Sequence, residues 1–335
     1  MSHGIMENDH AFYGNREPAW HRLGTVIDAD VVTSREAISL AKLDWTVEQH
    51  PLFANVPSDP ADYGGFTVEE LVNVPNKVAN VRMDTRDVLG IVTPHYHIVQ
   101  NADAFDFFDE LIGRGDAHYH TAGSLYNGRK VWALARLNRD ILIGGDPDEK
   151  IDPFICLANG HDGNTALSVY TTPIRVVCQN TLQWSLKEAS NMWKGKHTPN
   201  ITSKARDARD VLRLSNAYFD SLQTIGDRLI NAPMSNKDFV DMLETLVPLP
   251  TLEPDQNTRG LTIAENLRSD ITAAWQVDNI ANVKYTRWGF AQAVAEYVDL
   301  TKTHRSDDRF VDQNLLGTNS TRTLKDRSLD LALSF

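Results

Sequence analysis

The sequence has few features of membrane-bound, secreted or zinc-binding proteins. None of its apolar runs approaches the ~20 residues that a membrane-spanning helix needs. The first ten residues are polar and acidic and lack the apolar core of a secretory signal peptide. The two cysteines, Cys156 and Cys178, have no second Cys or His at zinc-finger spacing. We therefore expect a cytoplasmic protein without a membrane partner, in which both cysteines are small buried apolar residues.

The motifs of the best-known enzyme families are also missing. The sequence contains no G-x-S-x-G turn, no Walker loop, no G-x-G-x-x-G and no H-E-x-x-H. The segment NGHDGN at residues 159–164 places His161 beside Asp162, and such a pair can act as acid and base. The same composition also suits a hairpin loop, in which Gly takes positive φ and Asn or Asp bonds the backbone. We therefore expect no catalytic residue in this loop.

Four histidines form two H-x-H pairs, His95 with His97 and His118 with His120. On a strand, residues i and i+2 point to the same side, so each pair presents two imidazoles to one face. Four converging imidazoles could bind a transition metal. The first pair lies at the end of the strand expected at residues 88–99, and the second lies at the start of the strand expected at 118–126. If these two strands were parallel neighbours, the pairs would lie at opposite ends of the sheet. We therefore expect no metal and no cofactor.

Basic residues are in the minority, and the two signs of charge are unevenly distributed. The chain has 33 Lys and Arg against 45 Asp and Glu, a net charge of −12. Residues 1–117 contain 8 basic and 19 acidic residues, whereas residues 175–228 contain 9 basic and 5 acidic ones. An acidic chain resists non-specific binding to polyanions, but a local positive region permits a confined nucleic-acid or phosphate site. A solvated helix with interleaved charges is the simpler explanation of that region.

Hydrophobic periodicity predicts an α+β fold, in which antiparallel β hairpins pack on helices and an α-helical C-terminal region follows. Helices are expected at residues 34–43, 101–115, 179–189, 204–230, 237–247, 262–276, 290–300 and 324–335. Strands are expected at residues 45–54, 66–74, 77–85, 88–99, 118–126, 129–137, 153–158 and 165–177. The predicted domains are an α+β core module at residues 1–190, with its central part at about 88–188, a linker at 191–203 and an α-helical region at 204–335.

Turn and cap residues set several of these boundaries. Ser34 and Asn101 are expected as helix N-caps. Pro75-Asn76 and Arg86-Asp87 are expected to form turns between short strands. Asn127-Gly128 is the clearest hairpin signal, because it supplies two residues with positive φ for a type I′ turn.

Basic side chains alternate with aromatic ones from the hairpin around Asn127-Gly128 to the start of the helix expected at residues 204–230. Such a composition suits a groove that follows phosphates while bases stack on rings. Alternation places Lys130, Trp132 and Arg136 on one strand face, so Trp132 in the core with charges at the strand ends is the alternative. The candidate nucleic-acid-binding residues are Arg129, Lys130, Arg136, Arg175, Lys187, Lys194, Lys196, Lys204, Arg206 and Arg209, beside Trp132, Trp184 and Trp193.

Several motifs together resemble the phage/plasmid-like protein family known as domain of unknown function 932. The matching stretches are EPAWH with LG near the start, YHIVQNADAFDF, TAGSLYNGRKVWALARL, NGHDGN, TPIRVVCQNTL, KHTPNI and GFAQAVAEYVDL. The resemblance implies a setting in phages, prophages and plasmids, and it implies no mechanism.

The order of elements is more distantly similar to ring-forming single-strand annealing proteins of recombination. In those proteins a basic groove between a strand hairpin and a helix holds DNA around an oligomeric ring. The resemblance implies strand contributions from Arg129, Lys130, Arg136 and Arg175, and helical-side contributions from Lys187 and residues 194–204. The acidic balance and the long helical C-terminal region depart from that pattern.

Three functions are compatible with the sequence. The favoured one is a phage- or plasmid-encoded, non-catalytic protein that binds single-stranded DNA or RNA, with strand annealing as its activity and a homo-oligomeric ring as its assembly. The second is an interaction protein or host inhibitor that acts through its acidic surface. The third is a metal-dependent hydrolase or nuclease that uses His161-Asp162 or the H-x-H pairs.

Overall fold

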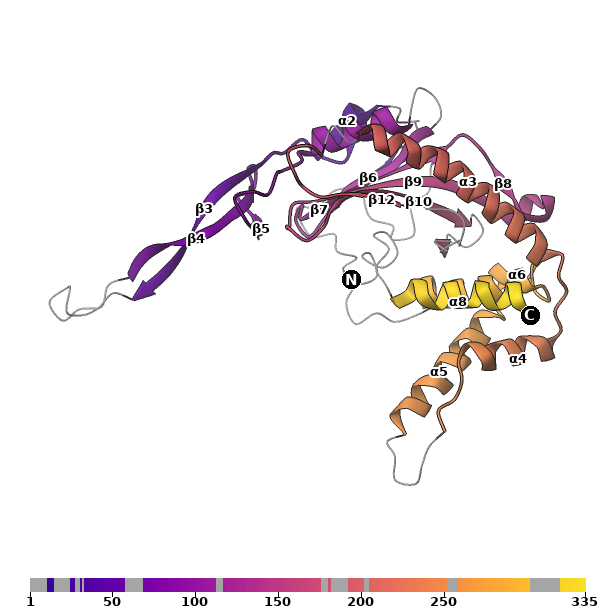
Figure 1. The fold of residues 1–335 in the computed structure, drawn as a ribbon. Helices are drawn as coiled ribbons and strands as arrows, with labels where there is room; N and C mark the ends of the chain where they lie inside the picture. The colour runs from indigo at the N-terminus through magenta and orange to yellow at the C-terminus, as the bar shows by residue number, and fades with distance from the viewer. Residues whose placement is uncertain are drawn as a thin grey trace.

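The computed structural model of the protein describes residues 11–14, 25–27, 31, 33–57, 69–112, 117–175, 180–181, 192–201, 205–251, 258–301 and 320–335. In that part of the chain, antiparallel sheets occupy the N-terminal half and helices make up most of the C-terminal region (Figure 1). The predicted α+β fold is therefore confirmed. None of the described helices has the length and apolar character needed to span a membrane.

A large sheet forms the centre of the molecule. Its strand order is β11-β10-β9-β7-β6-β1-β2, with β12 beside β10 and β8 beside β9. All of these pairs are antiparallel except β1 with β2. The strands are β1 (Ala11–Gly14), β2 (Thr25–Ile27), β6 (Ala117–Leu125), β7 (Lys130–Leu137), β8 (Ile141–Leu142), β9 (Lys150–Gly160), β10 (Leu167–Arg175), β11 (Asn180–Thr181) and β12 (Met192–Gly195).

The β6–β7 hairpin confirms the strongest turn signal of the sequence, with one difference. Asn127 and Gly128 both have positive φ, as expected. The turn also includes Tyr126 at φ 58°, and Leu125 pairs with Lys130, so four residues rather than two connect the strands.

Helices cover one face of the large sheet. They are α1 (Ser34–Leu40), α2 (Asn101–Ile112) and α3 (Ala205–Ile230), and Figure 1 shows α2 and α3 lying across the same side of the strands. Phe105 and Phe108, from the apolar stripe predicted for α2, are fully buried. Their ring centroids lie 6.0 and 5.7 Å from that of Tyr119 on β6. Aromatic packing of this kind holds α2 on the sheet.

The N-cap of α1 is Thr33 and not the predicted Ser34. Thr33 Oγ1 accepts the N–H of Glu36, the pattern of a helix cap. The Ser34 N–H donates to Asp109 and its hydroxyl to Asp106, both on α2. Ser34 therefore bonds a helix that is distant in the sequence, and its preference for helix N-caps does not determine its role.

The opposite face of the large sheet has an apolar cluster of its own. It comprises Leu125, Trp132, Leu134, Phe154, Cys156, Ala158 and Tyr170. Cys156 is fully buried, as expected, and burial raises the pKa of its thiol to about 12. Cys178 lies outside the described residues.

A second sheet consists of the three strands β3 (Val47–Pro57), β4 (Glu69–Arg82) and β5 (Val88–Val92). Figure 1 shows β3 and β4 projecting away from the body as a long hairpin, which we call the arm. The predicted turn at Pro75-Asn76 is wrong. Residues 74–77 form a bulge opposite Leu52, in which Asn76 takes φ 56°, and pairing continues on both sides.

The C-terminal region is built around α6, in which every residue from Trp288 to Glu296 is buried. It contacts α3, α5 and α8. The helices of this region are α4 (Asn236–Leu246), α5 (Arg259–Ala274), α6 (Arg287–Glu296) and α8 (Ser320–Ser334), with the short helical segments η4 (Asp278–Ile280) and η5 (Tyr297–Thr301). Two further short segments, η1 (Ile143–Gly145) and η2 (Pro147–Glu149), lie between β8 and β9. These helices confirm the predicted elements of the C-terminal region.

A buried carboxylate connects the helical region to the strands. Glu149 is fully buried before β9, and its oxygens accept hydrogen bonds from Trp288 Nε1 at 3.0 Å and from Asn282 Nδ2 at 2.7 Å. The helices therefore pack against the sheet through a specific polar contact.

Two boundaries differ from the sequence prediction. Asn180 and Thr181, expected to begin a helix, form strand β11 against β10, and residues 182–191 lie outside the described part of the chain. The predicted linker at 191–203 contains β12, which pairs with β10. The division into residues 1–190, 191–203 and 204–335 stays a prediction.

Candidate nucleic-acid interface

Four of the ten basic residues predicted to bind nucleic acid gather at one end of the large sheet. Arg129 and Lys130 lie where β7 begins, while Lys194 lies on β12 and Lys196 just after it. We call these four residues the basic cluster. Chain segments far apart in the sequence thus bring their positive charges to one place.

Strand register puts two of the four cluster residues, Lys130 and Lys194, on a single face. Lys194 pairs with Ser168, and Ser168 pairs with Ala158. Ala158 in turn pairs with Trp132, which follows Lys130 by two residues. Directly opposed residues share a face, as do residues two apart on a strand, so Lys130 and Lys194 point to the same side. Three strand spacings, ~14 Å in total, separate β7 from β12.

The cluster is accessible to an anion. Arg129, Lys194 and Lys196 are exposed, and among the described residues no carboxylate lies within ion-pair distance of these three. Lys130 is half-buried, with Nζ 5.5 Å from the ring centroid of Tyr126. Its ammonium group therefore makes a cation–π contact with that ring.

Arg136 lies at the other end of β7, where its charge is balanced. Its Nη2 is 2.7 Å from a carboxylate oxygen of Asp140 and 2.7 Å from one of Asp152. Lys150 adds a further contact to Asp140 at 3.0 Å. A guanidinium held by two carboxylates is a poor phosphate ligand, because those bonds must break first.

The remaining predicted residues do not join the cluster in the described structure. Arg175 pairs with Ile151, so it lies at the same end of the sheet as Arg136, and its side chain is not described. Lys187 and Lys204 lie outside the described residues. Two more, Arg206 and Arg209, lie on the first turns of α3, and their side chains are not described either.

The two described tryptophans among the candidates, Trp132 and Trp193, both pack against other side chains. Trp132 is only 2% exposed, which confirms the alternative that this ring belongs to the core. Trp193 is half-buried with its ring 5.4 Å from Phe107 of α2, and Trp184 lies outside the described residues. Tyr126, in the turn before the cluster, is half-buried and was not singled out from the sequence. Its position directly before the Asn127-Gly128 turn, close to Lys130 in the chain, was the feature of the sequence that could have identified it as part of the candidate interface.

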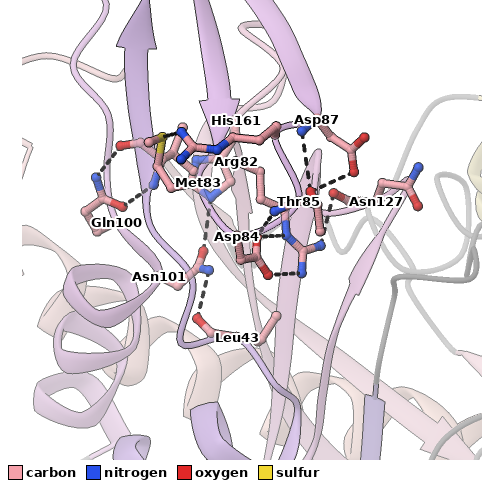
Figure 2. A network of polar contacts seen from close by, with 12 residues as sticks. Leu43, Arg82, Met83, Asp84, Thr85, Asp87, Gln100, Asn101, Asn127 and His161 are labelled. Atoms are coloured by element: carbon pink, nitrogen blue, oxygen red, sulfur yellow. Dashed lines mark hydrogen bonds and ion pairs between the residues drawn. The ribbon is translucent and has the colours of Figure 1, made fainter.

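The loop at residues 159–164 fastens the arm to the sheet. His161 is fully buried, and its backbone N–H donates to the carbonyl of Arg129. Asn80 of β4 donates through Nδ2 to the carbonyl of His161 at 2.8 Å. Figure 2 shows the second contact, in which Asn101 Oδ1 lies 3.0 Å from His161 Nε2. Asn101 Nδ2 donates to Leu43. The predicted N-cap Asn101 thus joins separate segments with its side chain.

The electrostatics of His161 suit a structural residue. Burial, reinforced by the nearby His197, lowers the pKa of the imidazole to about 3. Asn101 Oδ1 can only accept, so His161 Nε2 carries the proton. The ring is therefore neutral near pH 7, with one nitrogen committed to Asn101.

Asp162 organises the turn itself. Its Oδ1 accepts the N–H groups of Asn164 and Thr165, and its Oδ2 accepts the Thr165 hydroxyl. Gly163 has φ 79°, which favours glycine. The loop composition is thus explained by turn geometry, and Asp162 directs its bonds to the loop and not to His161.

The root of the arm is held by Arg82, which is buried. Its guanidinium lies 4.5 Å from the ring centroid of Trp45. It donates from Nε and Nη2 to Asp84 at 2.8 and 3.0 Å (Figure 2). This partnership with Arg82 lowers the pKa of Asp84. Gln100 exchanges two further bonds with the backbone of Val47.

The two H-x-H pairs lie in different environments. His95 and His97 follow β5 of the arm sheet, whereas His118 and His120 lie on β6 of the large sheet, so their strands are not parallel neighbours. Burial lowers the pKa of His120 to about 4. Within the described ranges, no three or more His, Cys, Asp or Glu side chains are arranged to hold a metal ion.

Comparison with known proteins gives one match. No curated protein and no solved structure matches the chain. Residues 88–320 match the family model described as domain of unknown function (DUF932), which covers well over half of the sequence. The protein therefore belongs to the DUF932 family.

Proposed function

We propose that this protein is encoded by a phage or plasmid and binds single-stranded nucleic acid, DNA in particular, without catalysing a covalent reaction. The basic cluster carries the proposal. Arg129, Lys194 and Lys196 are exposed at one end of the sheet, and Lys130 points to the same face as Lys194. Cations spaced in this way can contact successive phosphates of one extended strand.

The acidic remainder of the chain suits a confined site. With a net charge of −12, most of the surface repels a polyanion, so phosphates are attracted where the carboxylates are absent. Tyr126 beside Lys130 offers a ring on which a base can stack. Annealing in a ring-shaped homo-oligomer is the activity and assembly that we attach to this binding.

Salt dependence of binding to an oligonucleotide tests the proposal. A labelled single strand of about 30 nucleotides is long enough for more than one site. Four phosphate contacts predict a slope of log affinity against log salt of roughly −3. Lys194→Glu is expected to weaken binding and to reduce that slope by about 1. Lys237→Glu, which reverses an exposed lysine on α4, is the matched control and should bind like the wild type.

The outcome that removes the proposal is equally clear. Absence of binding at low salt, or equal losses in the Lys194 and Lys237 variants, would show that the cluster is not a nucleic-acid site. An assay that follows complementary labelled strands would separate simple binding from annealing.

A further inference from the structure

The arm presents apolar side chains to solvent on both of its faces. Phe53 on β3 is 49% exposed, and Leu71 and Val72 on β4 are 73% and 47% exposed. Phe53 and Leu71 lie on one face and Val72 on the other, because Asn55 pairs with Leu71. A two-stranded ribbon is only marginally stable in water, and exposed apolar surface marks interaction sites. We therefore expect the exposed apolar surface of the arm to bind a partner.

The charge of the arm excludes a polyanionic partner. Residues 51–76 contain four acidic residues and no Lys or Arg. Two of the four, Glu69 and Glu70, lie exposed on β4. Nucleic acid and anionic membrane surfaces would both be repelled by such a segment. A protein surface that is positively charged is the complementary partner.

The described structure contains one such surface, the basic cluster, but the arm cannot reach it within one molecule. The root of the arm is anchored beside the cluster, because Arg82 bonds the carbonyl of Asn127. From Val47 to Pro57 the arm then extends by ten residue steps, ~34 Å, away from the body (Figure 1). Its acidic end is therefore separated from its own cluster by the length of the hairpin.

We propose that the acidic arm of one copy of this chain binds the basic cluster of a second copy. Glu69 lies on the same face of the arm as Leu71 and Phe53, so its carboxylate would then approach the cations of the neighbour while these two apolar side chains pack beside it. Glu70, on the other face, adds to the negative charge of the same end. An arm-to-cluster contact is heterologous, so it repeats from copy to copy and closes into a ring or extends as a filament.

This inference goes beyond the proposed function and does not depend on it. It adds a form of regulation, because arm and nucleic acid would occupy the same cations. Nucleic acid would have to displace the arm of the neighbouring copy from the cluster, so the wild type would bind oligonucleotide less tightly than the Glu69→Lys/Glu70→Lys variant.

Reversing the charges of the arm in one variant and of the basic cluster in another tests this contact between copies. Full-length Glu69→Lys/Glu70→Lys and Lys194→Glu/Lys196→Glu variants are compared with the wild type by sedimentation velocity at low salt. Each variant alone brings like charges together and should sediment as a monomer. An equal mixture restores opposite charges at every contact and should assemble like the wild type. Lys237→Glu serves as the control that assembles normally, and far-UV circular dichroism confirms that each variant is folded.

Three results would overturn the inference. They are a wild type that stays monomeric at micromolar concentrations, variants that assemble alone, and a mixture that stays monomeric. The oligonucleotide titration distinguishes this failure from failure of the proposed function. If the mixture assembles but no species binds the oligonucleotide, the contact between copies stands and the proposed function falls.

Discussion

Arg82 Nη1 donates a hydrogen bond to the backbone carbonyl of Asn127 at 3.2 Å, and this contact joins the arm to the turn that precedes the basic cluster. The same guanidinium also bonds Asp84 and covers the ring of Trp45. One buried cation therefore holds the two surfaces to which we assign interactions in a fixed relation.

Removal of the Arg82 guanidinium is expected to destabilise the protein. Arg82→Ala loses the bonds to Asp84 and Asn127 and the contact with Trp45, at a cost of roughly 2–3 kcal/mol, because a buried network loses its centre. Urea unfolding measures the difference. Arg86→Ala, which alters an exposed arginine in the following turn, should cost less than about 1 kcal/mol. Equal costs for the two variants would contradict a special role for Arg82.

Elements with strong local signals were predictable from the sequence. The apolar stripe of α2 and the Asn127-Gly128 turn both depend on residues close together in the chain. The bulge at residues 74–77 was not predictable in this way. Asn76 indicated positive φ, but whether such a residue ends a strand or bulges within it depends on the pairing with β3.

The candidate interface also depends on pairing that local sequence cannot predict. Composition identified ten basic residues, but it could not show which of them lie at the same end of the large sheet. Lys194 joins Lys130 through the register of four strands, while Arg136 is balanced by Asp140 and Asp152. The number of accessible cations is therefore a property of tertiary structure.

Acidification is expected to destabilise the joint between arm and sheet. The pKa of His161 is about 3 in the folded protein and about 6.5 in an unfolded chain, so the unfolded state binds the proton first. The contribution of His161 to stability is therefore complete above pH 6.5 and is lost as the pH falls, by roughly 2 kcal/mol at pH 5. His161→Gln should reduce the difference in unfolding free energy between pH 7 and pH 5, as measured in urea.

The control for this prediction is His95→Gln, which changes an exposed ring and should keep the wild-type pH dependence. If His161→Gln kept it as well, the buried imidazole would not be the group that takes up the proton.

The Cys156 thiol is expected to be inert in the folded protein. Complete burial raises its pKa to about 12, so little thiolate forms near neutral pH and reagents have no access. In a Cys178→Ser background, a maleimide should label the native protein slowly and the urea-unfolded protein quickly. Rapid labelling of the native state would show that the β9 strand opens readily or that Cys156 is accessible.

Glu149 is expected to couple the helical region to the sheet. In Glu149→Ala, the donors Trp288 Nε1 and Asn282 Nδ2 both lose an acceptor, and Trp288 is fully buried. A cost of roughly 3 kcal/mol follows from those lost bonds. Glu149→Gln retains one acceptor oxygen and should cost less, because it leaves at most one donor without its bond. Urea unfolding followed by tryptophan fluorescence measures both. Equal stabilities of the two variants would mean that the acceptor oxygen retained by Gln does not help to hold the helices on the sheet.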